Sequence, residues 1–321
     1  MRHACALVTA HHRSGYTIRA GEREFLARVS GKYMAASSGR PDYPVAGDFV
    51  SVRFEGEAAV IEKLLPRKSL LARKKPGAGN ETQPIAANVD MVFSVMGLDG
   101  NFNPRRLERL LAAAAGSGAE CAVILTKRDL LPAPQLEEKI RLARPSCGNA
   151  PLFCASGLTG EGVAGIRAAI SEKTVCFIGS SGVGKSALIN RLLGEEAAKT
   201  GPARPNDCRG RHTTTARQMY FLPGGGAVID TPGVREMGLL EERTAGVSEV
   251  FPDIEEAALN CRFTSCHHED EAGCAVKAAV ESGAITAERY SSYMKLKRET
   301  APPPEYLRRK MLRLRRQGGG C

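Results

Sequence analysis

The chain has 321 residues, enough for two or three domains, and its hydrophobic content of 43% is ordinary for a soluble globular protein. No apolar run reaches the roughly 18 residues of a membrane-spanning helix, and the apolar stretch before His11 is too short for a secretory signal. We therefore expect a cytoplasmic protein with no membrane partner. The net charge of +10 favours polyanionic partners such as nucleic acid, although solubility alone would also explain it.

Residues 1–75 read as short strands between glycine and proline turns. Examples are GYTIRA, EFLARVS, PVAGDFVSVRF and EAAVIEKLL, and no long helix lies among them. This pattern predicts a small barrel or sandwich. Residues 67–80, RKSLLARKKPGAGN, are basic and then rich in glycine and proline, so we expect a linker or a mobile loop there.

Residues 82–240 alternate between strands and helices. NVDMVFSVM, CAVILT, PLFCAS, TVCFIG and AVIDTPG read as strands, and helices of about ten residues, the first at 104–115, follow the earlier ones. This alternation predicts a mostly parallel α/β sheet that binds its ligand at the carboxyl ends of the strands. Residues 245–321 read as helical, interrupted by a Cys/His cluster and ending in a basic tail.

A phosphate loop, GSSGVGKS, lies between the strand TVCFIG and a predicted helix. In this G-x-x-x-x-G-K-S pattern, glycines let backbone N–H groups surround phosphate oxygens, and the helix dipole points at them. A chance glycine-rich turn would lack this strand and helix. We expect Lys185 to reach the β- and γ-phosphates and Ser186 to bind Mg²⁺. The predicted phosphate contacts are Gly179, Ser180, Ser181, Gly182, Val183, Gly184, Lys185, Ser186 and Ala187.

Two further loops predict that the base is guanine. TKRD follows one strand, and its Asp129 carboxylate can accept two hydrogen bonds from guanine N1 and N2, which adenine does not supply. Lys127 would lie along the base plane. SGLTGEG follows another strand and would offer a backbone N–H to guanine O6. Alone, TKRD would also fit a solvated helix cap. The predicted contacts are Thr126, Lys127, Arg128, Asp129, Ser156 and Gly157.

DTPG follows a further strand and would contact the γ-phosphate end of the nucleotide. Asp230 would hold Mg²⁺ through water, and the N–H of Gly233 would sense the γ-phosphate. The polar, basic segment GPARPNDCRGRHTTTAR, which precedes this strand, fits a mobile switch. We assign its Thr214 as the second hydroxyl on Mg²⁺, with Thr213 as the alternative.

The residue that positions the attacking water is not where many GTPases carry it. Val234 follows DTPG and cannot orient water, so another group must do so or a partner must supply it. His212, in the predicted switch, is our candidate for this catalytic role beside Lys185. A solvent-exposed loop histidine is the alternative.

The order of these segments is unusual, because the base motifs precede the phosphate loop. Ras-like GTPases begin with the phosphate loop and end with the base motifs, so this order indicates a circularly permuted GTPase. Permutation is tolerable because the termini of a domain often lie close together.

CRFTSCHHEDEAGC has the spacing C-x4-C-x-H-x5-C, with Cys261, Cys266, His268 and Cys274 as ligands. Three thiolates and one imidazole make a closed tetrahedral Zn²⁺ site, which predicts a structural role. His267 is an alternative ligand. Unrelated cysteines in a loop are a poor explanation for three cysteines and two histidines in fourteen residues.

Taken together, the permuted order, HTTT before DTPGVRE, PVAGDFV, QPIAANVD and the Cys/His cluster resemble the family of ribosome small-subunit-dependent GTPase A. This resemblance implies an oligonucleotide-binding (OB) barrel, a permuted GTPase domain and a zinc-binding helical domain. It also implies the small ribosomal subunit and its rRNA as partners, with GTP hydrolysis stimulated by that subunit, and we expect a monomer.

Two positions depart from the family pattern. Thr126 replaces the usual Asn, and its hydroxyl would still tie the loops together. Gly157 replaces Ala, which should cost little because a backbone N–H makes the contact. Two other functions stay open: an RNA-binding assembly factor that uses GTP only as a binding switch, and a GTP-driven metal chaperone, against which the closed ligand set argues.

Overall fold

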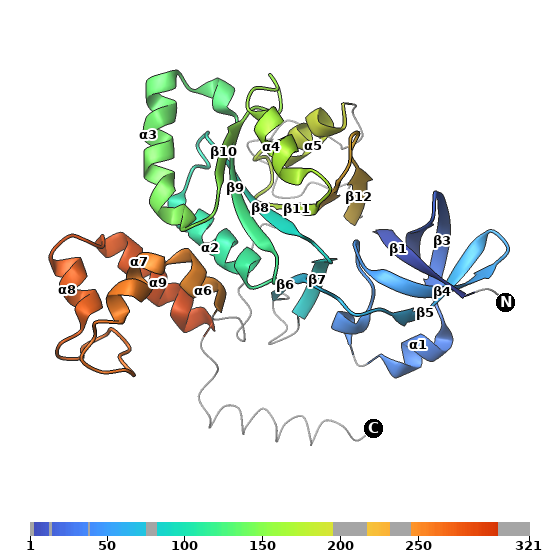
Figure 1. Ribbon diagram of the computed structural model, residues 1–321, viewed down its shortest axis with the longest axis horizontal. Helices are drawn as coiled ribbons and strands as arrows, with labels where there is room; N and C mark the ends of the chain where they lie inside the picture. Colours follow the sequence, from blue (N-terminus) through green and yellow to red (C-terminus); the bar gives the residue numbers. More distant parts are fainter. Residues whose placement is uncertain are drawn as a thin grey trace, which may run out of the picture.

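The computed structural model describes residues 3–12, 15–37, 39–74, 82–194, 217–231 and 245–300. Within these residues the chain forms an N-terminal barrel, a central α/β part and a C-terminal helical part, and the barrel and the helices lie on opposite sides of the centre (Figure 1). His212, Thr214, Gly233 and the basic tail lie outside the described residues.

The N-terminal strands close into a barrel with the order β1-β2-β3-β5-β4, in which β4 pairs back to β1. Its strands are β1 (His3–His12), β2 (Gly15–Ala20), β3 (Arg23–Val29), β4 (Phe49–Glu55) and β5 (Ala58–Leu64), with α1 (Gly31–Ala36) between β3 and β4. Alternating apolar side chains such as Val8, Ile18 and Val50 are fully buried inside it. The predicted OB-fold is confirmed, and β1 lies within the residues read as short strands, although its bounds were not predicted.

The predicted linker is partly wrong. β6 (Leu70–Lys74) pairs antiparallel with β7 (Thr82–Ala87), and this hairpin lies against the central part rather than forming a free connection. Leu71 and Ile85 are buried there in one hydrophobic cluster. Burial of these apolar side chains against the central part stabilises the two strands. This stabilisation exceeds the preference of the neighbouring basic and glycine-rich residues for a loop.

The central strands have the order β10-β9-β8-β11-β13-β12. They are β8 (Met91–Gly97), β9 (Glu120–Thr126), β10 (Leu152–Ala155), β11 (Thr174–Ile178), β12 (Arg217–Phe221) and β13 (Ala227–Asp230). From β10 to β13 neighbouring strands are parallel, and β12 runs antiparallel to β13. β11 lies in the middle of this sheet and leads into the phosphate loop. The base motifs follow β9 and β10, so they lie at the same carboxyl edge of the sheet as the phosphate loop.

Helices cover both faces of the central sheet. α2 (Pro104–Ala115) and α3 (Ala133–Ala143) pack on one face, and α4 (Val163–Ile170) and α5 (Lys185–Leu193) pack on the other. α2 begins where the sequence predicted, because Pro104 occupies its first turn and the Asn103 side chain accepts a hydrogen bond from the N–H of Arg106.

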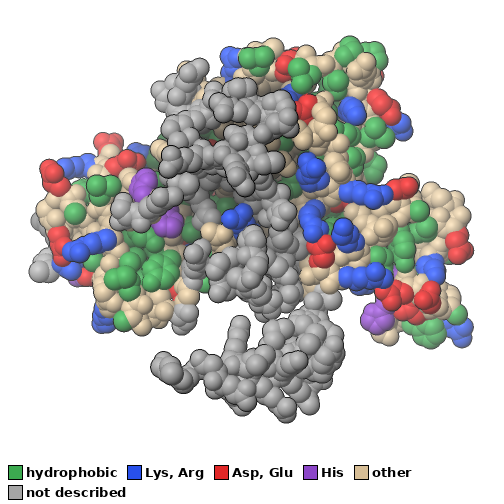
Figure 2. Space-filling model, turned by 180° about the vertical axis from the view of Figure 1, so that it is seen from behind, with side chains coloured by type: hydrophobic (Ala, Val, Ile, Leu, Met, Phe, Trp, Pro, Cys, Tyr) green, Lys and Arg blue, Asp and Glu red, His purple; other side chains and the backbone are tan. Residues whose placement is uncertain are grey.

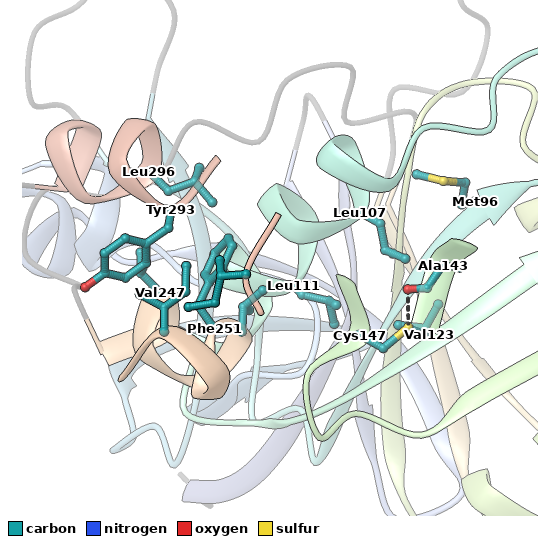
Figure 3. Packing of buried hydrophobic residues seen from close by; sticks show 14 of the residues in the cluster. Met96, Leu107, Leu111, Val123, Ala143, Cys147, Val247, Phe251, Tyr293 and Leu296 are labelled. Atoms are coloured by element: carbon teal, nitrogen blue, oxygen red, sulfur yellow. Dashed lines mark hydrogen bonds between the residues drawn. The ribbon is translucent and has the colours of Figure 1, made fainter. Parts of the chain in front are cut away.

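The C-terminal helices share a core with the central part. They are α6 (Ala245–Val250), α7 (Pro252–Ala258), α8 (Ala275–Glu281) and α9 (Ala287–Thr300). Figure 3 shows Leu111 of α2 near Phe251, with Val247 of α6 and with Tyr293 and Leu296 of α9 beyond it, all in one hydrophobic cluster. None of the helices in the described residues combines the length and apolar character needed to cross a membrane.

Candidate nucleotide-binding site

The phosphate loop between β11 and α5 depends on glycine at several positions. A Cβ on Gly179 would lie 2.3 Å from the carbonyl oxygen of Val95. Gly182 and Gly184 have φ angles of 78° and 97°, in the region that favours glycine. The loop therefore lies close against β8 and delivers the chain into α5 at Lys185.

Lys185 is held inside this loop. Its ammonium group donates hydrogen bonds to the carbonyl oxygens of Gly179 at 2.7 Å and Ser180 at 2.8 Å, and the residue is only 7% exposed. Burial lowers the pKa of Lys185 to about 8, although the Asp230 carboxylate opposes this shift. Conversely, burial raises the pKa of Asp230, and Lys185 opposes that shift.

Asp230 ends β13 directly beside β11, opposite Phe177 in the strand pairing. The next residue, Thr231, is buried, and its hydroxyl donates a hydrogen bond of 2.8 Å to the carbonyl oxygen of Phe177. This bond fixes the chain at the point where β13 ends. At this position the Asp230 carboxylate interacts electrostatically with the Lys185 ammonium at the start of α5.

Thr126 is the first residue of TKRD, the first of the two predicted base loops, and it joins this loop to the phosphate loop. Its buried hydroxyl donates to the carbonyl oxygen of Val183 and also lies 3.2 Å from that of Met96. Since a threonine hydroxyl has one proton, it donates to one of these oxygens at a time. The expected tie between the loops is confirmed by the bond to Val183, despite the replacement of Asn by Thr.

The rest of TKRD consists of two cationic side chains with carboxylate partners and the exposed Asp129. Lys127 adopts a left-handed backbone with φ of 63°, and its ammonium lies 2.6 Å from the Asp99 carboxylate. Arg128 forms an ion pair of 2.6 Å with Glu161, which belongs to the second base loop. The Arg128 side chain therefore links the two loops, and Asp129 is exposed beside them.

The second base loop is held by its own serine and by α5. The buried Ser156 hydroxyl accepts hydrogen bonds from the N–H groups of Leu158 at 3.2 Å and Thr159 at 3.0 Å. The Arg191 guanidinium donates to the carbonyl oxygen of Gly157 at 3.3 Å. A Cβ on Gly157 would lie 2.8 Å from backbone atoms of Ala187 and Leu188, so this loop packs closer to α5 than an alanine would allow.

Sequence reasoning missed Asp99, Glu161 and Arg191. Asp99 follows the end of β8, as the recognised motifs follow the ends of their strands, and this position was the available signal. The pairings of Glu161 and Arg191 depend on where the loops meet in the folded chain, so no local sequence pattern predicts them.

The cysteine and histidine residues of the predicted metal site come together. The ligand atoms of Cys261, Cys266, His268 and Cys274 all lie within 4.8 Å of one another. The Sγ atoms of Cys261 and Cys274 are 4.0 Å apart, and Nδ1 of His268 lies 3.6 Å and 3.5 Å from them. Metal bonds of about 2.0–2.3 Å in a tetrahedron place ligand atoms about 3.5–3.8 Å apart, so this donor set fits zinc.

The surrounding contacts distinguish the two histidines. His268 is buried, and its carbonyl oxygen accepts a hydrogen bond of 2.5 Å from the Tyr290 hydroxyl of α9. His267 is exposed, and its backbone N–H donates to Glu271. Cys274 caps α8 through a hydrogen bond from the N–H of Lys277. The cluster thus links the loop to both α8 and α9.

Comparison with known proteins gives consistent matches. The family model described as RsgA GTPase matches residues 64–240. Proteins described as small ribosomal subunit biogenesis GTPase RsgA are similar: one from Leptospira interrogans is 42% identical over 286 residues, covering 88% of this chain and 77% of its own. One from Opitutus terrae is 40% identical over 308 residues, covering 92% and 83%.

Solved structures are similar over almost the whole chain. The crystal structure of YjeQ from Thermotoga maritima has a TM-score of 0.68 at 27% identity and covers 93% of this chain and 99% of its own. YloQ, described as a circularly permuted GTPase, has a TM-score of 0.65 at 22% identity, covering 93% and 95%. The likeness to YloQ is one of fold.

Proposed function

This chain belongs to the RsgA GTPase family, and we propose that it hydrolyses GTP to GDP and phosphate in late maturation of the small ribosomal subunit, stimulated by that subunit. The observation that carries the proposal is the hydrogen bond from Thr126 to Val183, which joins the base loop to the phosphate loop. A phosphate site and a guanine site so connected fit one nucleotide.

We assign the phosphate end of the nucleotide to the loop between β11 and α5. Backbone N–H groups of residues 179–187 and the ammonium of Lys185 would stabilise charge on the transferred phosphoryl group as water attacks in line. Ser186, Thr214 and, through water, Asp230 would hold Mg²⁺. When bound, the metal would neutralise charge on the β- and γ-phosphates. Gly233 would sense the γ-phosphate through its N–H.

We assign the guanine end to the two base loops. The exposed Asp129 carboxylate would accept hydrogen bonds from N1 and N2, and a backbone N–H at Ser156–Gly157 would donate to O6. Lys127 would lie along the base plane. The ion pair between Arg128 and Glu161 supports the proposal because it holds these two loops together beside Asp129.

We propose that His212 orients the attacking water, since Val234 supplies no group for this purpose. A switch segment that carries the water-orienting residue would let a partner complete the catalytic arrangement. Slow unaided hydrolysis and stimulation by the small subunit would then have a common cause.

The remaining assignments concern partners. Cys261, Cys266, His268 and Cys274 would bind a structural Zn²⁺, and the barrel would contact rRNA. On the face in Figure 2, Lys and Arg side chains gather between the central part and the C-terminal helices, which supports a polyanionic partner. We propose that the protein acts in the cytoplasm as a monomer.

The guanine assignment is tested by Asp129→Asn. An asparagine amide donates one hydrogen bond and accepts another, which matches xanthine better than guanine. The variant should lose at least about tenfold in affinity for GDP and gain affinity for XDP, as measured by calorimetry. Glu138→Gln, which removes an exposed carboxylate from α3, should behave as wild type. Unchanged GDP affinity in Asp129→Asn would refute the assignment.

A further inference from the structure

Lys127 and Asp99 form a partly buried ion pair at the carboxyl edge of the central sheet. Their charged atoms are 2.6 Å apart, and their side chains are 26% and 22% exposed. Burial acts to raise the pKa of Asp99, but hydrogen bonds from Lys127 and from the N–H of Asn101 outweigh it, so the pKa lies below its usual value. The Asp99 carboxylate is therefore ionised at neutral pH.

The chain after β8 is shaped to present this carboxylate. Leu98 continues the ladder past the strand by donating to the carbonyl oxygen of Thr126 at 2.9 Å. Asp99 then turns back, with one carboxylate oxygen accepting the N–H of Asn101 at 3.0 Å. A Cβ on Gly97 would lie 2.9 Å from that same oxygen, so the glycine leaves the space that the carboxylate occupies.

From this arrangement we propose that Asp99 is a positioning residue for guanine: it holds the Lys127 ammonium so that the aliphatic stem of Lys127 lies extended along the base. A free lysine side chain would lose rotamer freedom when the base binds, and the ion pair removes part of that loss in advance. The inference rests on the proposed GTP site and adds a residue that contacts the base only through Lys127.

The proposal is tested by a double-mutant cycle on the full chain, with GDP affinity as the readout. Asp99→Asn keeps the shape of the side chain and removes its charge. Gly97→Ala keeps the charge and pushes the carboxylate away, and Gly97 is not among the residues with positive φ, so alanine is allowed on the backbone. Each should weaken GDP binding roughly fivefold.

In a Lys127→Ala background, Asp99→Asn should cause no further loss, because the residue acts through Lys127. Pyrophosphate, which has no base, should bind all variants with wild-type affinity. Glu120→Gln is the matched control, since it removes a carboxylate from an ion pair with Lys173 at the opposite end of the same strands. Melting temperatures should stay within about 2 °C of wild type.

Three results would overturn the inference: unchanged GDP affinity in Asp99→Asn, additive losses in the double variant, or an equal loss for pyrophosphate. Each of these presupposes wild-type protein that binds GDP. Wild-type protein that binds pyrophosphate but discriminates poorly between GDP and ADP would instead refute the proposed guanine site, and the inference with it.

Discussion

Lys185 is a buried cation whose charge state depends on pH in the range used for assays. With its pKa lowered to about 8 by burial, Lys185 in the free protein loses this charge as pH rises through about 8. Nucleotide phosphates favour the charged form, so binding raises the pKa. Affinity for GDP is then highest well below pH 8 and falls as pH rises through about 8, with a slope that approaches about tenfold per pH unit above the pKa.

This residue-scale prediction is checked by calorimetry of GDP binding between pH 7 and pH 9. The affinity should be flat at the acidic end and fall toward pH 9, with proton uptake accompanying binding where it falls. A flat affinity across the whole range would show that Lys185 keeps its proton in the free protein.

At the residue scale, local motifs were enough to identify the side chains whose residue type determines their role. GKS located Lys185, and TKRD located Thr126, whose hydroxyl reaches the phosphate loop. Asp99 and Lys127 lie 28 residues apart in the sequence, and no local sequence pattern predicts that they form an ion pair. Gly157 was interpreted as a neutral change, whereas the folded chain brings it against the backbone of α5.

The helix α2 connects the central part to the C-terminal helices through a buried charge. Glu108 of α2 is 4% exposed and pairs with Arg289 of α9 at 3.2 Å, and Ser146 and Ser292 also donate to it. Arg289, itself 9% exposed, makes a second ion pair with Asp253 of α7. Burial raises the pKa of Glu108, and these donors lower it in turn.

We expect Arg289→Met to destabilise the C-terminal helices by about 3–5 kcal/mol, because it leaves the Glu108 carboxylate buried without its cation. Hydrogen exchange should show early opening of α7 and α9 with strands β8 and β9 still protected. Adding Glu108→Gln should restore part of the loss.

Arg298→Met is the matched control on the same helix. Its exposed pair with Glu269 should contribute less than about 1 kcal/mol. If Arg289→Met were as stable as Arg298→Met, the buried network would not be what joins α9 to α2.

Elements with strong local signals were predicted well, and those defined by distant partners were not. α2 has Pro104 in its first turn and the Asn103 cap, and its bounds were predicted. β12 was missed and the bounds of β1 were not predicted, and these two strands pair with each other at Ala10 and Gln218. Short strands of this kind owe their stability to partners far along the chain, which a local pattern does not reveal.

For the whole molecule, both outer parts are attached to the GTPase core. The barrel continues the central sheet through β1 and β12, and the C-terminal helices share their hydrophobic cluster with α2. The boundaries expected near residues 75–82 and 240–245 fall at or within residues outside the described ranges. Composition predicted the presence of these parts, but the way they pack depends on tertiary contacts.

We expect the purified chain to contain one zinc ion, measured by native mass spectrometry. Cys266→Ser should lose the metal, whereas Cys5→Ser, which changes an exposed cysteine outside the cluster, should keep it.

Chelation of the zinc should expose the amides of α8 to hydrogen exchange, because Cys274 caps that helix. It should leave GDP affinity within about twofold, since the ties between the nucleotide loops involve no residue beyond 245. Loss of GDP together with zinc would contradict this.

The most direct test of the account is phosphate release from GTP with and without purified small ribosomal subunits, for wild type and His212→Ala. We predict slow release by the chain alone, stimulation of at least about tenfold by subunits, and loss of that stimulation in His212→Ala with GTP binding retained. Tight binding to subunits without any stimulation of wild type would contradict the account, and would favour an RNA-binding factor that uses GTP only as a switch.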